Sequence, residues 1–339
     1  MLKGGEGPLK DVVSLSSLNV DYLYEAEDLS FLEPFFPEGG YRRQWTIDDP
    51  DRAAPLHRVL EEKARLLTKS AGGSGANAVY CLAKMGFASG LMGKIGGDEE
   101  GEFLLKENGI VPFRRLVRNE KTGISLIVLG PSRDRTIIRI PNANRTLSWD
   151  DVDLDFLFPF SILHLTSLPG DGLQIQIRVV EELVGRMDVA FDPGETYVRK
   201  GLTALWPILR RCRWLFITEG ELETLSGTPF PQAVSKVQAS GVRTLVIKRK
   251  GAGATIINES GAWDLPAEPV KAVDTTGAGD VFAAAFLAGV LKGLNPLECG
   301  RLALTLSRQS MLGLGRTAYP NREDFEKTLG GIGLKREGK

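Results

Sequence analysis

Cysteine and histidine are scarce in this chain. Its 339 residues include three cysteines, Cys81, Cys212 and Cys299, and two histidines, His57 and His164. No CxxC pair occurs, so we do not expect a structural zinc site. An odd, widely spaced set of thiols is typical of reduced cysteines in a cytoplasmic protein. We therefore expect a cytoplasmic location, and core or surface roles for the two isolated histidines.

Long apolar runs and an excess of one charge are also lacking. The longest apolar run, at 281–292, is too short to span a bilayer, and the glycine-rich polar stretch at 1–10 does not have the pattern of a signal peptide. Basic and acidic residues number 42 and 43, which gives a net charge of −1. No global positive field would recruit nucleic acid. The sequence thus predicts neither a membrane nor a nucleic-acid partner.

The most informative stretch is Asp-Thr-Thr-Gly-Ala-Gly-Asp at 274–280, which runs directly into an apolar helix. Gly277 and Gly279 let the backbone approach a ligand closely, and the free N–H groups of the helix start form an anion site. The carboxylate of Asp280 fits such a site if it takes a proton from a nucleophile that attacks the anion. The stretch therefore predicts phosphoryl transfer to a hydroxyl. Taken alone, Asp280 would be read more often as a helix cap.

Strands and helices alternate regularly from about residue 160. Apolar strands are predicted at 162–165, 189–191, 214–217 and 244–247, with helices at 173–184, 203–210 and 231–239. A first strand at 11–15 and helices at 56–67 and 76–85 precede them. Near-continuous apolar strands that alternate with helices indicate a doubly wound, mostly parallel α/β sheet with helices on both faces. We expect one domain over residues 1–339.

Two β-rich segments, at about 22–50 and 111–141, lie outside this alternation. The second contains predicted strands at 111–117, 123–129 and 136–140, with a turn at 130–134. We expect the two segments to form a small β lid inserted in the domain, although they could instead extend the main sheet. An open lid edge invites pairing with another chain, so we also expect a homodimer through the lid.

Together these features resemble the ribokinase-like (PfkB) carbohydrate kinase family over most of the chain. The stretch at 274–280 and its small-residue helix match the C-terminal signature. The N-terminal signature is matched by Gly72-Gly73 with Asn77, and by the Gly-x-x-Gly-x-Asp-x-x-Gly pattern at 93–101. Asp21, after the first strand, stands where the family keeps a substrate-binding aspartate. Two signatures in the correct order are far more specific than a lone glycine-rich loop.

The resemblance implies an ATP-dependent sugar kinase that phosphorylates a hydroxymethyl group of a small carbohydrate, with ATP and Mg²⁺ as cofactors. It implies Asp280 as the catalytic base and an anion hole formed by the backbone of Gly277, Ala278 and Gly279. The implied substrate-binding residues are Asp21, Gly72, Gly73 and Asn77. The implied ATP-binding residues are Thr218, Lys248, Gly251, Gly253 and Thr275. The resemblance places Glu221 at the magnesium site, acting through water.

Two positions depart from the family pattern. The usual Asn-x-x-Glu run reads Thr218-Glu219-Gly220-Glu221, so the acid is kept while a hydroxyl replaces the amide. We expect retuned phosphate contact rather than inactivity. Lys250 stands where the nucleotide loop often has glycine, so the adenine pocket follows the family pattern least closely.

Several residues have a structural alternative to the functional one. Asp21 could be a turn acid, and Asn77 on its apolar helix needs a fixed partner that could be backbone. Glu221 could simply belong to a solvated acidic helix start. Arg135, Arg139 and Asn144 are expected to face the cleft from the lid.

Two other functions stay open at this stage. A nucleoside kinase of the same fold would use the aromatic segment at 22–50 to stack on a base. A sugar is favoured, because an aromatic stripe more often serves packing. A non-catalytic sugar-binding regulator is disfavoured by the retention of Asp280 with Gly277 and Gly279.

Overall fold

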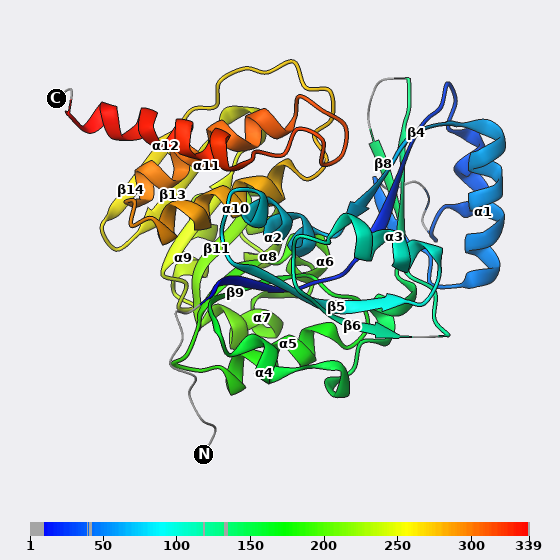
Figure 1. The fold of residues 1–339 in the computed structure, drawn as a ribbon, viewed down its shortest axis with the longest axis horizontal. Helices are drawn as coiled ribbons and strands as arrows, with labels where there is room; N and C mark the ends of the chain where they lie inside the picture. The colour runs from blue at the N-terminus through cyan, green and yellow to red at the C-terminus, as the bar shows by residue number, and fades with distance from the viewer. Residues whose placement is uncertain (1–9, 39, 41–42, 118, 132–134, 338–339) are drawn as a thin grey trace.

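The computed structural model describes residues 10–38, 40, 43–117, 119–131 and 135–337 (Figure 1). The predicted turn at 130–134 lies mostly outside these residues, as does nearly all of the polar stretch at 1–10. Within the described ranges, no helix has both the length and the apolar character needed to cross a membrane. The chain folds into two sheets of unequal size, which meet at the candidate site described below.

The larger sheet has nine strands in the order β14-β13-β12-β11-β10-β9-β1-β5-β6. Its strands are β1 (Lys10–Leu15), β5 (Ser89–Gly96), β6 (Phe113–Val117), β9 (Phe160–Thr166), β10 (Asp188–Asp192), β11 (Cys212–Thr218), β12 (Thr244–Lys248), β13 (Ala254–Asn258) and β14 (Gly261–Leu265). Seven of the strands are parallel, and β13 and β14 add an antiparallel edge. The predicted doubly wound, mostly parallel sheet is confirmed.

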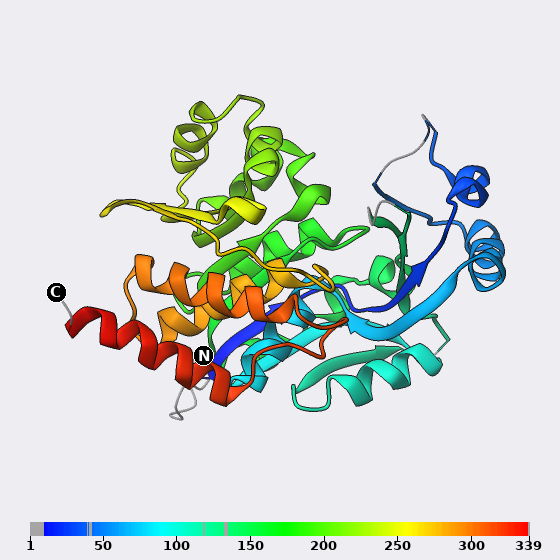
Figure 2. The same cartoon turned by 90° about the horizontal axis from the view of Figure 1, so that it is seen from above.

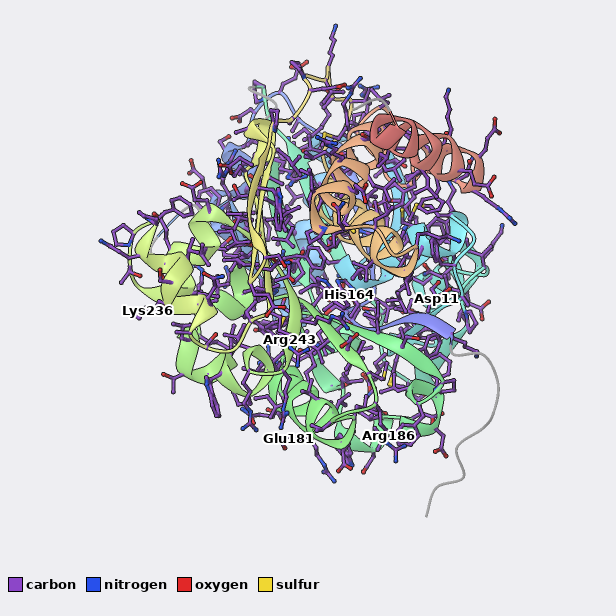
Figure 3. The ribbon with its side chains drawn as sticks, turned by 90° about the vertical axis from the view of Figure 1, so that its left-hand side faces the viewer. Asp11, His164, Glu181, Arg186, Lys236 and Arg243 are labelled. Atoms are coloured by element: carbon purple, nitrogen blue, oxygen red, sulfur yellow. The ribbon has the colours of Figure 1, made fainter. Side chains whose placement is uncertain are left out.

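Helices cover both faces of this sheet, as its apolar strands require. One face packs against α2 (Ser74–Lys84), α10 (Ala278–Leu291), α11 (Pro296–Ser310) and α12 (Arg322–Glu337). The other packs against α4 (Leu154–Leu157), α5 (Gly172–Glu182), α6 (Gly194–Val198), α7 (Gly201–Leu209), α8 (Glu219–Ser226) and α9 (Gln232–Gln238). Seen from the side, His164 lies inside the molecule, whereas Glu181 and Lys236 mark the outer surface (Figure 3). The fold thus has two separate apolar cores, one on each side of the sheet.

The smaller sheet has five strands in the order β3-β8-β7-β2-β4. They are β2 (Asn19–Glu25), β3 (Gln44–Thr46), β4 (Arg65–Gly72), β7 (Gly123–Leu129) and β8 (Arg135–Ile140), with α1 (Pro50–Lys63) and the short 3-10 helix η1 (Ser30–Phe35) packed beside them. Viewed from above, this small sheet and α1 occupy one end of the molecule, and α12 the other (Figure 2).

Two boundary predictions at the small sheet are wrong. The helix predicted at 56–67 ends at Lys63, and residues 65–72 form β4 because they pair antiparallel with β2. The strand predicted at 111–117 as part of the lid is β6, which pairs with β5 in the main sheet. The reason is the helix α3 (Glu99–Glu107), which follows β5 and returns the chain to the same sheet edge as a parallel crossover.

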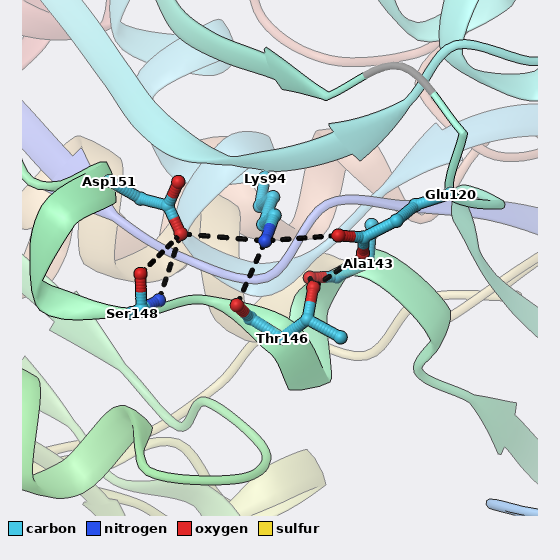
Figure 4. Close-up of polar contacts among 6 residues, drawn as sticks. All are labelled: Lys94, Glu120, Ala143, Thr146, Ser148 and Asp151. Atoms are coloured by element: carbon cyan, nitrogen blue, oxygen red, sulfur yellow. Dashed lines mark hydrogen bonds and ion pairs between the residues drawn. The ribbon is translucent and has the colours of Figure 1, made fainter.

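A buried ion-pair cluster fixes the connection between the two sheets (Figure 4). Lys94 on β5 has a side chain that is 8% exposed and lies 3.2 Å from Glu120 and 3.5 Å from Asp151. Its ammonium also donates to the carbonyl of Thr146 at 2.8 Å. Glu120 precedes β7, whereas Thr146 and Asp151 lie between β8 and β9. One cation therefore holds both segments against the central sheet.

Replacing Lys94 with methionine should therefore destabilise the protein. The change removes the ammonium that lies 3.5 Å from the carboxylate of Asp151, which is 5% exposed. Breaking a buried pair from one side costs about 3 kcal/mol. Urea unfolding should show this loss for Lys94→Met, and almost none for the exposed Lys106→Met on α3. A loss below about 1 kcal/mol for Lys94→Met would contradict the structural role of the cluster.

Candidate active site

The stretch at 274–280 lies where the carboxyl ends of the parallel strands meet the start of α10. Gly277 is the N-cap of α10 and has a φ of 77°, a conformation that favours glycine. A Cβ on Gly277 would lie 2.0 Å from Oη of Tyr319, so no side chain fits there. The first N–H groups of α10 have no acceptor inside the helix, although that of Ala278 donates to the carbonyl of Thr275 at 3.4 Å. This end of α10 can therefore receive an anion.

Asp280 lies in the first turn of α10 and contacts α2. Its Oδ2 accepts a hydrogen bond of 2.7 Å from Nδ2 of Asn77. The sequence assigned Asn77 to substrate, but here its amide faces the carboxylate predicted to be the catalytic base. Ser74, at the start of α2, donates a second hydrogen bond to Asp280.

Burial, together with a smaller effect of the nearby charge of Asp192, raises the pKa of Asp280 to about 7. The hydrogen bond from Asn77, the cation of Lys248 and the hydrogen bond from Ser74 act in the opposite direction. A carboxyl group with a pKa near neutrality can both accept and release a proton under ordinary conditions. Asp280 is therefore suited to general-base chemistry.

Lys248 ends β12 next to the stretch at 274–280, which is called the anion loop below. Its Nζ lies 2.6 Å from Oδ2 of Asp192, which ends β10. The charges of Asp192, Glu221 and Asp280 raise the pKa of Lys248 against the opposing effect of burial. A Cβ on Gly279 would lie 3.7 Å from the same Nζ. The residue assigned to ATP thus carries a stable positive charge beside Gly279.

Asp21 lies in a polar row that crosses the small sheet. It pairs with Ser70 on β4 and with Ser125 on β7, and Ser125 pairs in turn with Arg139 on β8. Burial raises the pKa of Asp21 to about 6, while a hydrogen bond from Ser125 and the charges of Arg316 and Arg139 oppose the rise. Because directly paired residues share a face, the row offers hydroxyl, carboxylate and guanidinium groups together.

Two glycines shape the space around Asp21. A Cβ on Gly72 would lie 2.1 Å from Oδ2 of Asp21, and one on Gly73 would lie 2.1 Å from the carbonyl oxygen of Ser17. Gly73 also has a φ of 100°. The resemblance implied that Gly72 and Gly73 bind substrate. In the structure, the lack of a side chain at both positions allows close approach of the backbone to Asp21 and to Ser17.

Thr218 and Glu221 form a capping box at the start of α8. The carboxylate of Glu221 accepts hydrogen bonds from N and Oγ1 of Thr218, both at 2.8 Å, and the N–H of Glu221 donates back to Oγ1. The hydroxyl that replaces the family's amide thus completes a helix cap. Glu221 still acts electrostatically on Lys248.

The predicted nucleotide loop follows β12. Lys250 has a φ of 50°, which explains why a glycine is the usual residue there. Gly251 has open space around its Cα, whereas a Cβ on Gly253 would lie 1.9 Å from the carbonyl oxygen of Leu265. Gly253 is thus needed for the turn into β13. Thr275 is exposed in the loop that precedes α10.

Arg316 is a site residue that the sequence did not reveal. It follows α11 in a loop, and its Nε donates to Oδ1 of Asn77 at 2.9 Å. Its charge acts on both Asp21 and Asp280. Its hydrogen-bond partners Asn77 and Asn108 lie more than two hundred positions away in the chain, so no local pattern marks it.

The three residues expected to face the cleft from the lid have different environments. Arg135 donates to Oγ1 of Thr276 at 3.0 Å and so links the small sheet to the anion loop. Arg139 bonds to Gln44 at 3.0 Å. Asn144 instead holds both backbone groups of Leu18 at 2.8 Å, so its role is structural and that expectation is wrong.

Gly72→Ala should disable substrate binding without unfolding the protein. The added Cβ would displace the carboxylate of Asp21, and misplacement of a positioning group can cost about a hundredfold in kcat/KM. Gly330→Ala is the matched control, because open space surrounds Gly330 in α12. Steady-state kinetics should show the loss for the acceptor and not for ATP. Equal losses for both would show that Gly72 has only a general structural role.

Comparison with known proteins agrees with this geometry. The model of the pfkB family carbohydrate kinases matches residues 47–322. The chain belongs to this family. Members are phosphotransferases with an alcohol group as acceptor, and both sugar kinases and nucleoside kinases share the ribokinase-like fold.

Three relatives illustrate the range of this carbohydrate kinase family. A sugar kinase of Archaeoglobus fulgidus is 34% identical over 230 residues, which cover 65% of this chain and 90% of the relative. The ribokinase of Arabidopsis thaliana is 30% identical over 298 residues, which cover 81% and 76%. A solved structure of Arabidopsis thaliana ribokinase, complexed with ribose and ATP, gives a TM-score of 0.71 at 25% identity and covers 95% of this chain and 99% of that chain. The adenosine kinase of Sinorhizobium meliloti shares the fold, with a TM-score of 0.81 at 20% identity and coverage of 96% and 99%.

Proposed function

We propose that this protein uses ATP to phosphorylate a hydroxymethyl group of a small carbohydrate. The observation that carries the proposal is the position of Asp280. Its carboxylate lies at the start of α10, beside the anion-binding loop, and has a pKa of about 7. A proton acceptor next to a site for a phosphoryl group is the arrangement that transfer to a hydroxyl needs.

In the proposed reaction, Asp280 removes the proton from the attacking hydroxyl. The backbone N–H groups of Gly277, Ala278 and Gly279 face the charge that develops on the transferred group. Asp21 orients the acceptor by accepting hydrogen bonds from its hydroxyls. Lys248, held by Asp192 at 2.6 Å, adds positive charge at the same end of the sheet.

ATP would lie along the ends of β11 and β12, against Thr218, Lys248, Gly251, Gly253 and Thr275. The carboxylates of Asp192 and Glu221 both act on Lys248, and they are hard oxygen donors of the kind that Mg²⁺ accepts. Among the described residues, no three side chains of the His, Cys, Asp and Glu types form a metal cluster. Glu221 would therefore hold Mg²⁺ through water, and the ion would neutralise phosphate charge when bound.

The small sheet supports a sugar over a nucleoside as acceptor. Tyr22, Tyr24, Phe35 and Trp45 are all at most 9% exposed and belong to one apolar core with Leu60 of α1. These aromatic side chains are used in packing and do not offer a stacking surface. The polar row around Asp21 instead suits a compact set of hydroxyls.

The small sheet also suits a role as a lid on a single kinase domain. Arg135 bonds to Thr276 of the anion loop, and Gln44 bonds to Glu195 at the start of α6. Closure of such a lid would exclude water and suppress ATP hydrolysis. Its edge strand β4 exposes 48% of Leu66, and we place a homodimer contact at this edge. The buried free thiols and the use of ATP are in keeping with a cytoplasmic enzyme.

Asp280→Asn should abolish turnover while the fold and ATP binding persist. Asparagine has nearly the same size and shape as aspartate but cannot take a proton, and a general base typically contributes 10²–10⁴-fold. In the unchanged protein, kcat/KM should fall as the pH drops below about 7, because protonation removes the base. Release of ADP, measured from pH 5.5 to 9, tests both statements. A residual rate above about a tenth of the original rate would refute the assignment of the base.

The same substitution should change stability in a pH-dependent way. The folded state holds the proton of Asp280 up to about pH 7, whereas an ordinary carboxyl group releases it near 3.8. Stability of the unchanged protein therefore declines as the pH rises from about 4 to about 7. Asp280→Asn removes this decline, so its Tm relative to the unchanged protein should be higher at pH 8 than at pH 4. A pH-independent difference in Tm would contradict the raised pKa.

The acceptor should be a monosaccharide or similar polyol. Buried polar groups that expect hydroxyl partners reject analogues without them, so one sugar should stand out by a large factor. The measurement is kcat/KM across ribose, fructose, 2-keto-3-deoxygluconate, adenosine, inosine and cytidine at fixed ATP. If a nucleoside exceeds every sugar by tenfold, the enzyme is a nucleoside kinase, and the small sheet binds the base.

A further inference from the structure

A chain of hydrogen bonds runs from the loop after α11 to the proposed catalytic base. Nε of Arg316 donates to Oδ1 of Asn77 at 2.9 Å, and Nδ2 of Asn77 donates to Oδ2 of Asp280 at 2.7 Å. At its other end, Nη1 of Arg316 donates to Oδ1 of Asn108 at 2.7 Å. Asn77, Asn108 and Arg316 are all buried.

The direction of each bond in this chain is fixed by chemistry. A guanidinium group donates hydrogen bonds and cannot accept them. Arg316 must therefore face the oxygen of the Asn77 amide, which leaves the NH₂ group of that amide toward Asp280. An NH₂ donor favours the ionised carboxylate over the protonated one. The orientation of Asn77, and with it the state of Asp280, is thus determined by Arg316.

The anchoring of Arg316 is equally specific. Nδ2 of Asn108 donates to the carbonyl of Leu104 at 2.9 Å, so the oxygen of Asn108 is turned toward the guanidinium. The guanidinium carbon lies 4.5 Å from the ring centre of Tyr80. The guanidinium is therefore held from two sides, by an amide oxygen and by an aromatic ring.

One nitrogen of Arg316 makes this arrangement costly. Its Nη2 is buried and has no hydrogen-bond partner among the described residues. A buried donor without a partner destabilises the fold. The arginine thus carries a cost in stability, which a role in positioning neighbouring groups would account for.

We propose that Arg316 is a positioning residue that fixes the amide of Asn77 and thereby keeps the carboxylate of Asp280 aligned for proton removal. The proposal rests on the proposed role of Asp280 as the base. It assigns Asn77 a part in catalysis in addition to any contact with the acceptor.

Other groups also face Asp280 and enter the test. Asp192 and Lys248 act on it from β10 and β12, and Ser74 from α2. Tyr319 and Cys81 also lie within its electrostatic reach. None of these groups changes when Arg316 is replaced, so a change in the pH profile would come from the chain through Asn77 or from the lost charge.

The experiment compares Arg316→Met and Arg316→Lys with Lys84→Met as the control. Nζ of Lys84 donates to the carbonyl of Tyr319 at 2.7 Å. Lys84→Met therefore loosens the same loop without touching Asn77. All three variants and the unchanged protein are assayed for ADP release from pH 5.5 to 9, and their Tm values are recorded.

Arg316→Met should lower kcat at pH 7 by about ten- to a hundredfold. It should also move the acid limb of the pH–activity profile, the fall in activity at low pH, upward by about one pH unit. Arg316→Lys, which keeps a donor and its charge, should recover part of both effects. Lys84→Met should lower the Tm and leave the acid limb in place.

Two results would overturn the inference. The first is an acid limb that stays in place in Arg316→Met while Asp280→Asn is inactive, which leaves the proposed function intact. The second is an equal shift in Lys84→Met, which would reduce Arg316 to a loop anchor. Activity in Asp280→Asn would instead overturn the proposed function itself. Should Arg316→Met fail to fold, Asn108→Ala removes the Nη1 acceptor alone, and it should give a smaller shift of the same sign; no shift would overturn the inference.

Discussion

The structure depends on holding one carboxylate, that of Asp280, in a partly buried position where it can still ionise. Burial alone would hold the proton on, and the adjacent charge of Asp192 adds to that effect. The hydrogen bond from Asn77 and the cation of Lys248 oppose it. The four residues come from four elements, α10, β10, α2 and β12. The doubly wound sheet is what brings them together, because the carboxyl ends of its parallel strands meet the starts of the helices at one edge.

Close backbone approach is the second requirement, and it explains the glycines better than ligand contact does. A side chain on Gly277 would collide with Tyr319, and one on Gly72 would collide with Asp21. Each glycine thus makes room for a neighbouring functional or packing group. The signature residues of the family act partly on each other, and a contact to ligand need not be assumed for every one of them.

The sequence could predict those parts of the fold that depend on local pattern. Apolar strands at 162–165 and 214–217 and the helix after 280 lie where periodicity placed them. Two segments could not be assigned locally. The helical apolar spacing extends to residue 67, yet residues 65–72 pair with β2. Residues 111–117 join the main sheet because α3 returns the chain there. In both cases a partner that is distant in the chain outweighs local preference.

The residues of the candidate site also differ in whether a local sequence pattern marks them. Asp280 directly precedes an apolar helical run and Asp21 comes soon after the first strand, so the sequence alone could single out both as candidates. Arg316 has no such signal, since its partners Asn77 and Asn108 lie more than two hundred residues away.

The two departures from the family pattern are also explained only by the three-dimensional structure. Thr218 completes a capping box with Glu221, and Lys250 adopts a left-handed conformation. A hydroxyl can close that helix cap, and a lysine can bear the cost of the turn, so neither departure removes the proposed phosphate site. We propose that selectivity for the acceptor rests on the small sheet, where Asp21, Ser125 and Arg139 share one row. That row is set by strand register rather than by any motif.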